Sequence, residues 1–303
     1  MTLLRNIAAL IIAVLQLPYD QLYAQTTKDF CASTFSFEEY HSDNIQLPYR
    51  QAVTTNSESP SRLIIYLHGG TSKGDDNISP INEAGVDSIM RFITNNHLSS
   101  VFIVPQCPVN ESWGGKLTGV LRGLIDDCKF HFTEIKDIYL LGGSMGGTGT
   151  WNMVSKYPRL FSAAMPVAGN PAKCDVENVA QTPLFIVMGA NDRIMGTDMV
   201  KDFISQLNTA GAQYIFDIEE GWTHEDTCIK SYTMQRLKWL FSYSKQSESS
   251  SISPPNIPRQ PTLTDTKYWT LSGKSVANPT EGFYLIQQIY SDKSIKTSKL
   301  YIR

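Results

Sequence analysis

The chain has 303 residues, of which 42% are hydrophobic, and its formal net charge at pH 7 is −3. This length is enough for one domain with a large hydrophobic core and a second, smaller module. The slightly negative charge argues against a nucleic-acid partner, because such a surface needs clustered lysine and arginine. No stretch of about 18 apolar residues occurs, so we expect no membrane-spanning helix in the mature protein.

The first 24 residues have the three parts of a secretory signal. MTLLR carries a positive charge, NIAALIIAVLQLP is an apolar run, and Leu22-Tyr23-Ala24 ends in a small residue before Gln25. A buried helix would explain the apolar run, but not the charged start and the small-residue end. We therefore predict that residues 1–24 are a signal peptide and that the protein is secreted or displayed at the cell surface, with the periplasm as the alternative.

Export makes disulfide bonds possible for the five cysteines. Their spacing fits neither a zinc ribbon nor a CxxC redox motif, and we expect no metal and no cofactor. Cys128 belongs to a helical pattern and is predicted to be an inert, buried thiol. Cys174 and Cys228 each follow a strand-like run at the expected catalytic edge, so we predict a bridge between them.

Between about residues 45 and 243, short apolar runs alternate with helical patterns. Such runs separated by helices are typical of buried parallel strands with helices on both faces. We predict an α/β fold with a mostly parallel, doubly wound sheet, whose ligands gather at the carboxyl ends of the strands. The apolar runs are 61–70, 100–106, 138–143, 162–169, 183–189 and 214–220; the helical segments are 81–97, 116–130, one through Trp151 and Val154, 200–210 and 233–243.

The third apolar run leads into a glycine-rich stretch, IYLLGGSMGGTGT, at residues 138–150. A phosphate loop needs a lysine that this stretch lacks, and a dinucleotide fingerprint needs a different glycine spacing. Gly142, Ser144 and Gly146 do match G-x-S-x-G between a strand and a helix, the pattern of a turn that exposes a nucleophile. The flanking glycines avoid clashes in such a tight turn. We interpret Ser144 as the nucleophile, with a packing turn as the alternative.

The partners of Ser144 follow from chain order, because in this arrangement the acid and the base come after the serine. Of the five histidines only His224 lies beyond Ser144, and it follows the last strand-like run. Asp192 follows the preceding run, and Asp198 is a second choice at the start of the next helix. We expect His224 to take the proton of Ser144 and Asp192 to orient the imidazole.

Two fixed N–H donors are needed to stabilise the oxyanion that forms when a serine attacks a carbonyl. The backbone N–H of Met145, directly after the nucleophile, is one candidate. The loop after the first apolar run supplies the other, for which Gly70 is the first choice and Thr71 the second. His68 in the same loop is interpreted as a structural brace. Thr71 is also a candidate for contact with the substrate.

Tryptophans are the remaining candidates for a substrate-binding surface. Trp113, Trp151 and Trp222 follow or flank segments at the expected catalytic edge, although core packing would explain each of them equally well. Trp222 is the best candidate, because it lies two residues before His224. Trp113 is the second candidate for contact with the substrate.

Four segments resemble the α/β-hydrolase superfamily, in particular its secreted predicted-peptidase and polysaccharide-esterase branch, which includes feruloyl-esterase-like enzymes. They are LIIYLHGGTSKGDDN, FIVPQCPVNESW, IYLLGGSMGGTGTWNMVSKYPRLFSAAMPVAGN and PLFIVMGANDRI. The resemblance covers residues 45–243 and implies an α/β-hydrolase fold with Ser144, Asp192 and His224 as a catalytic triad. The chain departs from relatives in two places, with His-Gly-Gly-Thr for their frequent His-Gly-x-Gly and with Thr223 where a glycine often precedes the histidine.

The C-terminal part of the chain changes in composition. Residues 244–261 are rich in serine and proline and are predicted to be a linker after the catalytic domain at 25–243. Residues 262–303 alternate short β-like runs with turn pairs and predict a small β module, a disordered tail being the alternative. This module resembles the C-terminal sorting module of secreted Bacteroidetes proteins, which would imply contact with secretion machinery.

The function that we expect is that of a secreted serine carboxylic ester hydrolase. Residues 169–182 are too few for a large cap, so the predicted site is open and suits esters on a polymeric carrier, such as feruloyl or acetyl groups on plant polysaccharide. A serine peptidase of the same fold is one alternative. The other is a non-catalytic surface-binding protein with a relic hydrolase fold.

Overall fold

The computed structural model describes residues 34–42, 45–55, 59–245, 263–290, 293 and 295–302. The chain divides into two compact units, Met1–Ile252 and Ser253–Arg303. The predicted signal peptide, Cys31 and all but the first two residues of the predicted linker lie outside the described residues. Secretion therefore stays a prediction.

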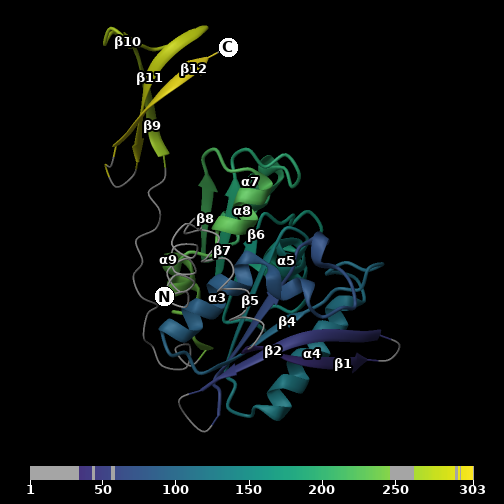
Figure 1. Cartoon of the computed structure of the whole chain (residues 1–303). Coiled ribbons are helices and arrows are strands. Elements are labelled where there is room, and N and C mark those ends of the chain that lie inside the picture. The colour runs from purple at the N-terminus through teal and green to yellow at the C-terminus, as the bar shows by residue number, and fades with distance from the viewer. Residues whose placement is uncertain are drawn as a thin grey trace, which may run out of the picture. The chain divides into compact units, whose positions relative to one another are not determined.

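An eight-stranded sheet forms the centre of the first unit (Figure 1), with the strand order β1-β2-β4-β3-β5-β6-β7-β8. The six strands from β3 to β8 are parallel to one another, as the alternating pattern predicted. β1 and β2 form an antiparallel hairpin, and β2 pairs antiparallel with β4. The strands are β1 (Ser36–Ser42), β2 (Ile45–Thr54), β3 (Arg62–Leu67), β4 (Ser100–Pro105), β5 (Asp137–Gly143), β6 (Ala163–Val167), β7 (Leu184–Gly189) and β8 (Tyr214–Glu219).

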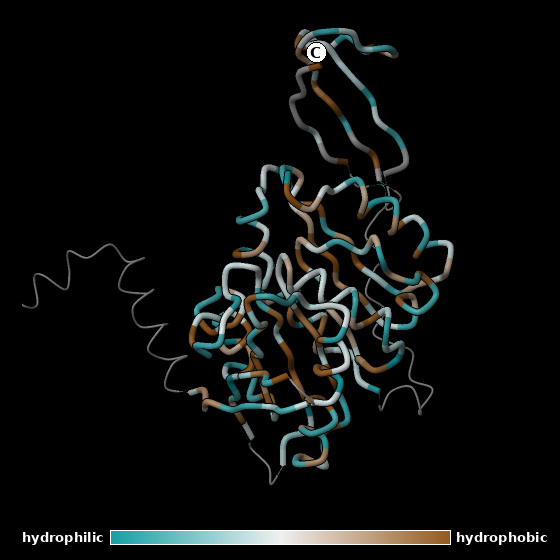
Figure 2. Tube along the Cα trace, turned by 90° about the vertical axis from the view of Figure 1, so that its right-hand side faces the viewer, coloured by the Kyte–Doolittle hydropathy of each residue, from teal (hydrophilic) through white to brown (hydrophobic). Residues whose placement is uncertain are grey.

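Helices cover both faces of this sheet, because alternate strand residues point to opposite sides. Leu63, Ile65 and Leu67 of β3 belong to one core cluster, and Ile64 and Tyr66 belong to the other. Figure 2 shows the hydrophobic colour concentrated in these central strands. The first cluster packs on α4 (Leu117–His131), α5 (Met145–Lys156), α6 (Val176–Val179) and α7 (Thr197–Thr209); the second packs on α3 (Ala84–Asn95), α8 (His224–Lys230) and α9 (Met234–Leu240).

Two short 3-10 helices, η1 (Gly70–Ser72) and η2 (Ser79–Asn82), lie between β3 and α3. The amphipathic helix predicted at 116–130 is α4, and its apolar stripe is buried as expected. Leu124 on that stripe has no exposed surface; burial of one such side chain stabilises a fold by about 1.5–3 kcal/mol. Within the described ranges, no helix has both the length and the apolar character that crossing a membrane requires.

The predicted bridge between Cys174 and Cys228 is wrong, since both thiols are free. Cys174 packs against the cluster that contains α5, whereas Cys228 packs against the cluster that contains α8. The sheet lies between these two clusters. The sequence places both cysteines after strands, but it does not say on which face each side chain falls.

The second unit is a four-stranded antiparallel sheet with the order β10-β9-β11-β12. This confirms the prediction of a small β module over the described residues. A sheet of three or more strands can be stable where an isolated hairpin is marginal. A role of this sheet in sorting stays a prediction. Its strands are β9 (Leu263–Thr270), β10 (Ser275–Val276), β11 (Gly282–Tyr290) and β12 (Ile295–Ile302).

Candidate active site

Ser144 lies in a strained turn between β5 and α5. Its φ of 57° and ψ of −117° are unfavourable for a residue with a side chain, and such strain costs about 1–3 kcal/mol. A Cβ on Gly142 would lie 2.4 Å from the carbonyl oxygen of Gly146, and a Cβ on Gly146 would lie 1.8 Å from that of Leu67. Both positions therefore require glycine, which is the steric cause inferred from the G-x-S-x-G spacing.

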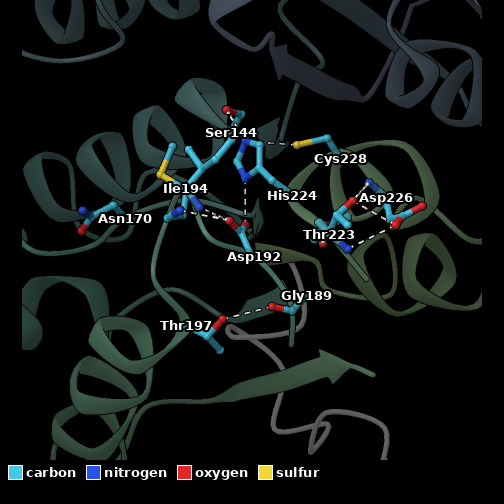
Figure 3. Close-up of polar contacts among 12 residues, drawn as sticks. Ser144, Asn170, Gly189, Asp192, Ile194, Thr197, Thr223, His224, Asp226 and Cys228 are labelled. Atoms are coloured by element: carbon cyan, nitrogen blue, oxygen red, sulfur yellow. Dashed lines mark hydrogen bonds and ion pairs between the residues drawn. The ribbon is translucent and has the colours of Figure 1, made fainter. Parts of the chain in front are cut away.

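His224 is the first residue of α8, and a local capping arrangement holds it there. Thr223 is the N-cap: its hydroxyl accepts from the N–H of Asp226, and the Asp226 carboxylate accepts from the N–H of Thr223. Figure 3 shows this pair beside His224. A helix start therefore takes the place of the glycine that often precedes the histidine in relatives, and it sets the direction of the imidazole.

The three candidate catalytic side chains meet at the carboxyl edge of the sheet (Figure 3). His224 Nε2 lies 2.8 Å from Ser144 Oγ, and His224 Nδ1 lies 2.8 Å from Asp192 Oδ2. A carboxylate only accepts hydrogen bonds, so Nδ1 carries the ring proton and Nε2 accepts from the Ser144 hydroxyl. This is the arrangement that lets an imidazole act as a general base toward a serine.

Asp192 is held by the loop that follows β7. It is 6% exposed, and its Oδ1 accepts from the N–H groups of Ile194 at 2.9 Å and Met195 at 3.0 Å. Asp198, the second choice from the sequence, has a side chain that is 94% exposed and pairs with Lys201. Asp192 is therefore the acid that contacts His224.

The loop after β3 lies against the nucleophile. A Cβ on Gly69 would be 3.7 Å from the Cβ of Ser144. Gly70 and Thr71 follow at the start of η1 and are exposed. The first N–H groups of a helix have no acceptor within the helix, and Met145 occupies the same kind of position at the start of α5. Both proposed oxyanion donors, Gly70 and Met145, thus belong to helix starts beside Ser144.

His68 braces this loop from below. Its Nδ1–H donates to the carbonyl of Gly69 at 2.6 Å, and its Nε2 accepts from the N–H of Cys107 at 2.9 Å. The bond that Nε2 accepts requires a neutral ring, and burial lowers the pKa of His68 to about 4. The indole N–H of Trp113 donates to the carbonyl of His68 at 3.0 Å. These contacts support the interpretation of His68 as a structural residue.

Glu83 is a residue of this site that the sequence did not identify. Its Oε1 accepts from the N–H of Gly69 at 2.9 Å and from the hydroxyl of Ser72 at 2.7 Å, and its Oε2 accepts from the hydroxyl of Tyr66 at 2.8 Å. Burial raises its pKa, against the effect of these hydrogen bonds. Glu83 directly precedes α3, so in the sequence it looks like an ordinary helix-start acid.

The three candidate tryptophans differ in burial, and Trp151 has no exposed surface and packs in the core. Trp113 is 1% exposed and packs in the core, so its predicted contact with substrate is wrong; its indole N–H has its acceptor inside the protein. Trp222 is partly exposed, and its ring centre lies 5.7 Å from Lys230 Nζ and 5.8 Å from Arg236 Cζ. Trp222 therefore contacts two cations, and Thr71 remains an exposed neighbour of Gly70.

Cys228 lies at this site as a free thiol, whereas the sequence analysis had assigned it to a bridge with Cys174. It lies one turn after His224 on α8, and its Sγ is 4.0 Å from His224 Nε2 (Figure 3). Burial raises the pKa of its thiol to about 12. The thiolate is the nucleophilic form of cysteine, so this neutral thiol does not compete with Ser144.

The sheet order, the turn at Ser144 and the solved structures that resemble this chain together define an α/β-hydrolase fold. A thermostable esterase has a TM-score of 0.66 at 23% identity, covering 71% of this chain and 64% of its own. The feruloyl esterase module from Clostridium thermocellum has a TM-score of 0.52 at 14% identity, covering 67% and 88%. An acylaminoacyl peptidase from Pyrococcus horikoshii has a TM-score of 0.54 at 13% identity, covering 70% and 42%.

Within this fold, the dienelactone hydrolase family model matches residues 120–251. That range includes Ser144, Asp192 and His224. Protein usf from Aquifex pyrophilus is 27% identical over 112 residues, which are 36% of this chain and 48% of that protein. The chain thus spans about half the length of the curated relative that it matches.

Proposed function

We propose that the protein is a serine carboxylic ester hydrolase. The observation that carries the proposal is the continuous hydrogen-bonded series from Ser144 through His224 to Asp192, with 2.8 Å at each step. The match to the dienelactone hydrolase family and the likeness to esterases support a hydrolase. A binding protein would need neither this series nor a strained serine.

In the proposed reaction, His224 removes the proton of Ser144 as Ser144 Oγ attacks the carbonyl carbon of the ester. The N–H groups of Met145 and Gly70 stabilise the resulting oxyanion. The intermediate collapses, the bond to the alcohol breaks, and the alcohol leaves with the proton from His224. Water then attacks the acyl-enzyme by the same route, which releases the acid and restores Ser144.

We propose carbohydrate-linked esters, with a feruloyl or acetyl group, as the substrate class. The connection between β6 and β7 contains only the short helix α6, so an ester on a bulky carrier has access to Ser144. The likeness to a feruloyl esterase module agrees with this class. The signal-like residues 1–24 support secretion, which would bring the protein to extracellular polysaccharide.

The test compares the wild-type chain with Ser144→Ala. We expect the wild type to hydrolyse p-nitrophenyl acetate, methyl ferulate or acetylated xylan and to react with a fluorophosphonate probe, and the variant to do neither. Ser205→Ala, which changes a hydroxyl on the exposed face of α7, is the matched control. A wild type that is neither labelled nor active on the three esters would overturn the proposal.

A serine peptidase remains the second candidate, because the acylaminoacyl peptidase shares the fold. It would use the same nucleophile, so probe labelling does not separate the two. Acylated peptides and esters must be compared directly at equal concentration. A higher kcat/KM on acylated peptides would favour the peptidase.

A further inference from the structure

A hollow of about 610 Å³ lies on the side of α5 that faces the loop after β6. Its wall is formed by the exposed side of α5, by the loop before α4 and by residues 170–173. Ligand pockets in proteins range from about 300 to 1,000 Å³. The hollow is therefore large enough for a short stretch of an oligosaccharide.

Ser144 and His224 do not line the hollow, but its wall contains residues one turn of α5 from Ser144 and next to Asp192. Thr148 in its wall donates its N–H to the carbonyl of Ser144 at 3.0 Å, and its hydroxyl accepts from the N–H of Asn170 at 3.0 Å. Met195, also in the wall, donates its N–H to Asp192. A substrate whose ester lies at Ser144 can therefore extend into the hollow.

The charge of the hollow differs from that of the chain. Lys156 and Lys173 are in its wall and are exposed, while the wall contains no aspartate or glutamate. Among the described residues neither lysine forms an ion pair with a carboxylate. The nearby Asp175 caps α6, where it accepts from the N–H of Asn178. Lys156 Nζ lies 5.9 Å from the centre of the Tyr157 ring. Two lysines that have no carboxylate partner in the described part of the chain thus share one concave surface in a chain of net charge −3.

The rest of the wall combines hydroxyl and amide groups with Gly114, Gly115, Ala172 and Met195. Asn152 is already bound, since its Nδ2 donates to the carbonyl of Trp113 at 2.8 Å. Side-chain hydroxyls of serine and threonine make up most of the other polar groups. Hydroxyl groups both donate and accept, so such a wall suits a ligand that carries many hydroxyls. Three of these hydroxyls already bond to the backbone: Thr118 donates to the carbonyl of Gly115, Thr148 accepts from Asn170, and Ser155 accepts from Asp175. Each still has a second hydrogen-bonding function for a ligand.

We propose that this hollow binds the alcohol part of the substrate, a polyhydroxylated carrier with negative charges such as a chain of uronic acid units. This inference rests on the proposed esterase function, because it assigns the carrier of the ester that Ser144 attacks. Lys156 and Lys173 pair with the anions of the carrier, and the polar wall binds its hydroxyls. Exposed ion pairs are weak and are screened by salt.

The test measures binding by calorimetry to the Ser144→Ala chain, which prevents turnover. The probes are trigalacturonate, a sulfated carrageenan tetrasaccharide and neutral xylotriose. We expect at least one anionic probe to bind more tightly than xylotriose, and more weakly as salt is added. A tighter trigalacturonate complex indicates a uronate carrier, and a tighter sulfated complex indicates a sulfated one; both support an anionic polyol.

Lysine variants locate the binding. We expect Lys156→Gln and Lys173→Gln each to weaken the anionic complex roughly threefold and to leave xylotriose binding unchanged. Lys238→Gln, an exposed lysine on α9 at the other face of the sheet, is the control. Equal binding of neutral and anionic probes, or anionic binding that the two lysine variants leave unchanged, would overturn the inference.

A second measurement separates this inference from the esterase proposal. In the chain with Ser144 intact, Lys156→Gln and Lys173→Gln should hydrolyse p-nitrophenyl acetate like the wild type and raise KM for acetylated pectin at constant kcat. A chain that hydrolyses small esters but shows no lysine-dependent anion binding retains the esterase function and loses the carrier assignment. Lysine-dependent binding without any ester hydrolysis contradicts the esterase alone.

Discussion

The carboxylate of Glu83 accepts a hydrogen bond from the backbone N–H of Gly69 at 2.9 Å. This bond connects the loop beside Ser144 to the start of α3. The same oxygen holds Ser72 at the other end of η1. Gly70 and Thr71 lie between these two anchored residues. Glu83 thus acts on the proposed oxyanion donor through the loop and touches no reacting atom, so it is a positioning residue.

Replacing Glu83 by alanine should lower kcat for p-nitrophenyl acetate by about 10²-fold, the scale on which a lost oxyanion donor acts, with a smaller change in KM. Glu83→Gln should restore most of the rate, because an amide oxygen still accepts from Gly69 and Ser72. Steady-state kinetics of both variants check this. A Glu83→Ala chain with wild-type kcat would show that the loop holds its shape without the carboxylate.

The choice between the two acids leads to a second prediction. Asp192→Asn should reduce kcat by about 10³–10⁴-fold, because the amide no longer stabilises the required tautomer and charge of His224. Asp198→Asn changes an exposed side chain that pairs with Lys201 and should leave kcat within about twofold. If the two variants lose activity equally, Asp192 is not the residue that orients His224.

Gly146, in the turn that holds Ser144, leads to a prediction about stability. Gly146→Ala would force a Cβ to within 1.8 Å of the carbonyl oxygen of Leu67 and should reduce the free energy of unfolding by about 3 kcal/mol. Gly119→Ala is the matched control. It lies on the exposed side of α4 with no atom in reach of the new methyl group, and it should stabilise the helix by about 0.5–1 kcal/mol. Urea unfolding measures both changes.

We predict that stability depends on pH because the pKa of His68 differs between the folded and the unfolded chain. Its pKa falls from 6.5 to about 4 on burial. Between these two values the unfolded chain binds a proton that the folded chain does not, so stability falls as the pH decreases from 6.5 to 4. The loss reaches about 3 kcal/mol. Above pH 6.5 the ring is neutral in both states and contributes no slope.

The measurement of this effect must remove the opposite contribution of Glu83. Burial raises the pKa of that carboxyl above its usual 4.5, so the folded chain holds the extra proton and stability falls as the pH rises through that region. Urea unfolding of the Glu83→Gln variant at pH 7 and pH 4.5 therefore measures the effect of His68 without this opposing contribution. An NMR titration of the His68 ring in that variant gives the pKa directly, and a value near 6.5 would contradict the prediction.

The turn at Ser144 was predictable from the sequence, because the glycine spacing that marks it lies within five residues. Gly142 and Gly146 are each two residues from Ser144, and the clashes that exclude a side chain involve the backbone of the same turn and of the adjacent strand β3. All six parallel strands were readable as apolar runs. Five of them are buried on both faces, whereas β8, at the edge of the sheet, is only partly buried.

Other features of the site depend on contacts between distant parts of the chain. Glu83 lies 14 residues beyond Gly69 and has no motif of its own. Tryptophan is a residue type that often contacts substrates, but the indole N–H of Trp113 donates to the carbonyl of His68 inside the core. Neither contact leaves a periodic or spacing signal in the amino-acid order.

Residue spacing and hydrophobic periodicity were enough to place the parallel strands and most helices along the chain and to locate the turn at Ser144. They also named three side chains that could meet there. These signals are readable because secondary-structure periodicity and turn spacing extend over only a few residues. The tertiary structure brought Asp192, the first choice from the sequence, to His224, and it placed Cys174 and Cys228 in separate core clusters. The tertiary structure also brought the Glu83 carboxylate to Gly69 and Ser72 in the loop after β3. Those outcomes depend on the face of the sheet on which each side chain falls and on where loops from distant strands converge.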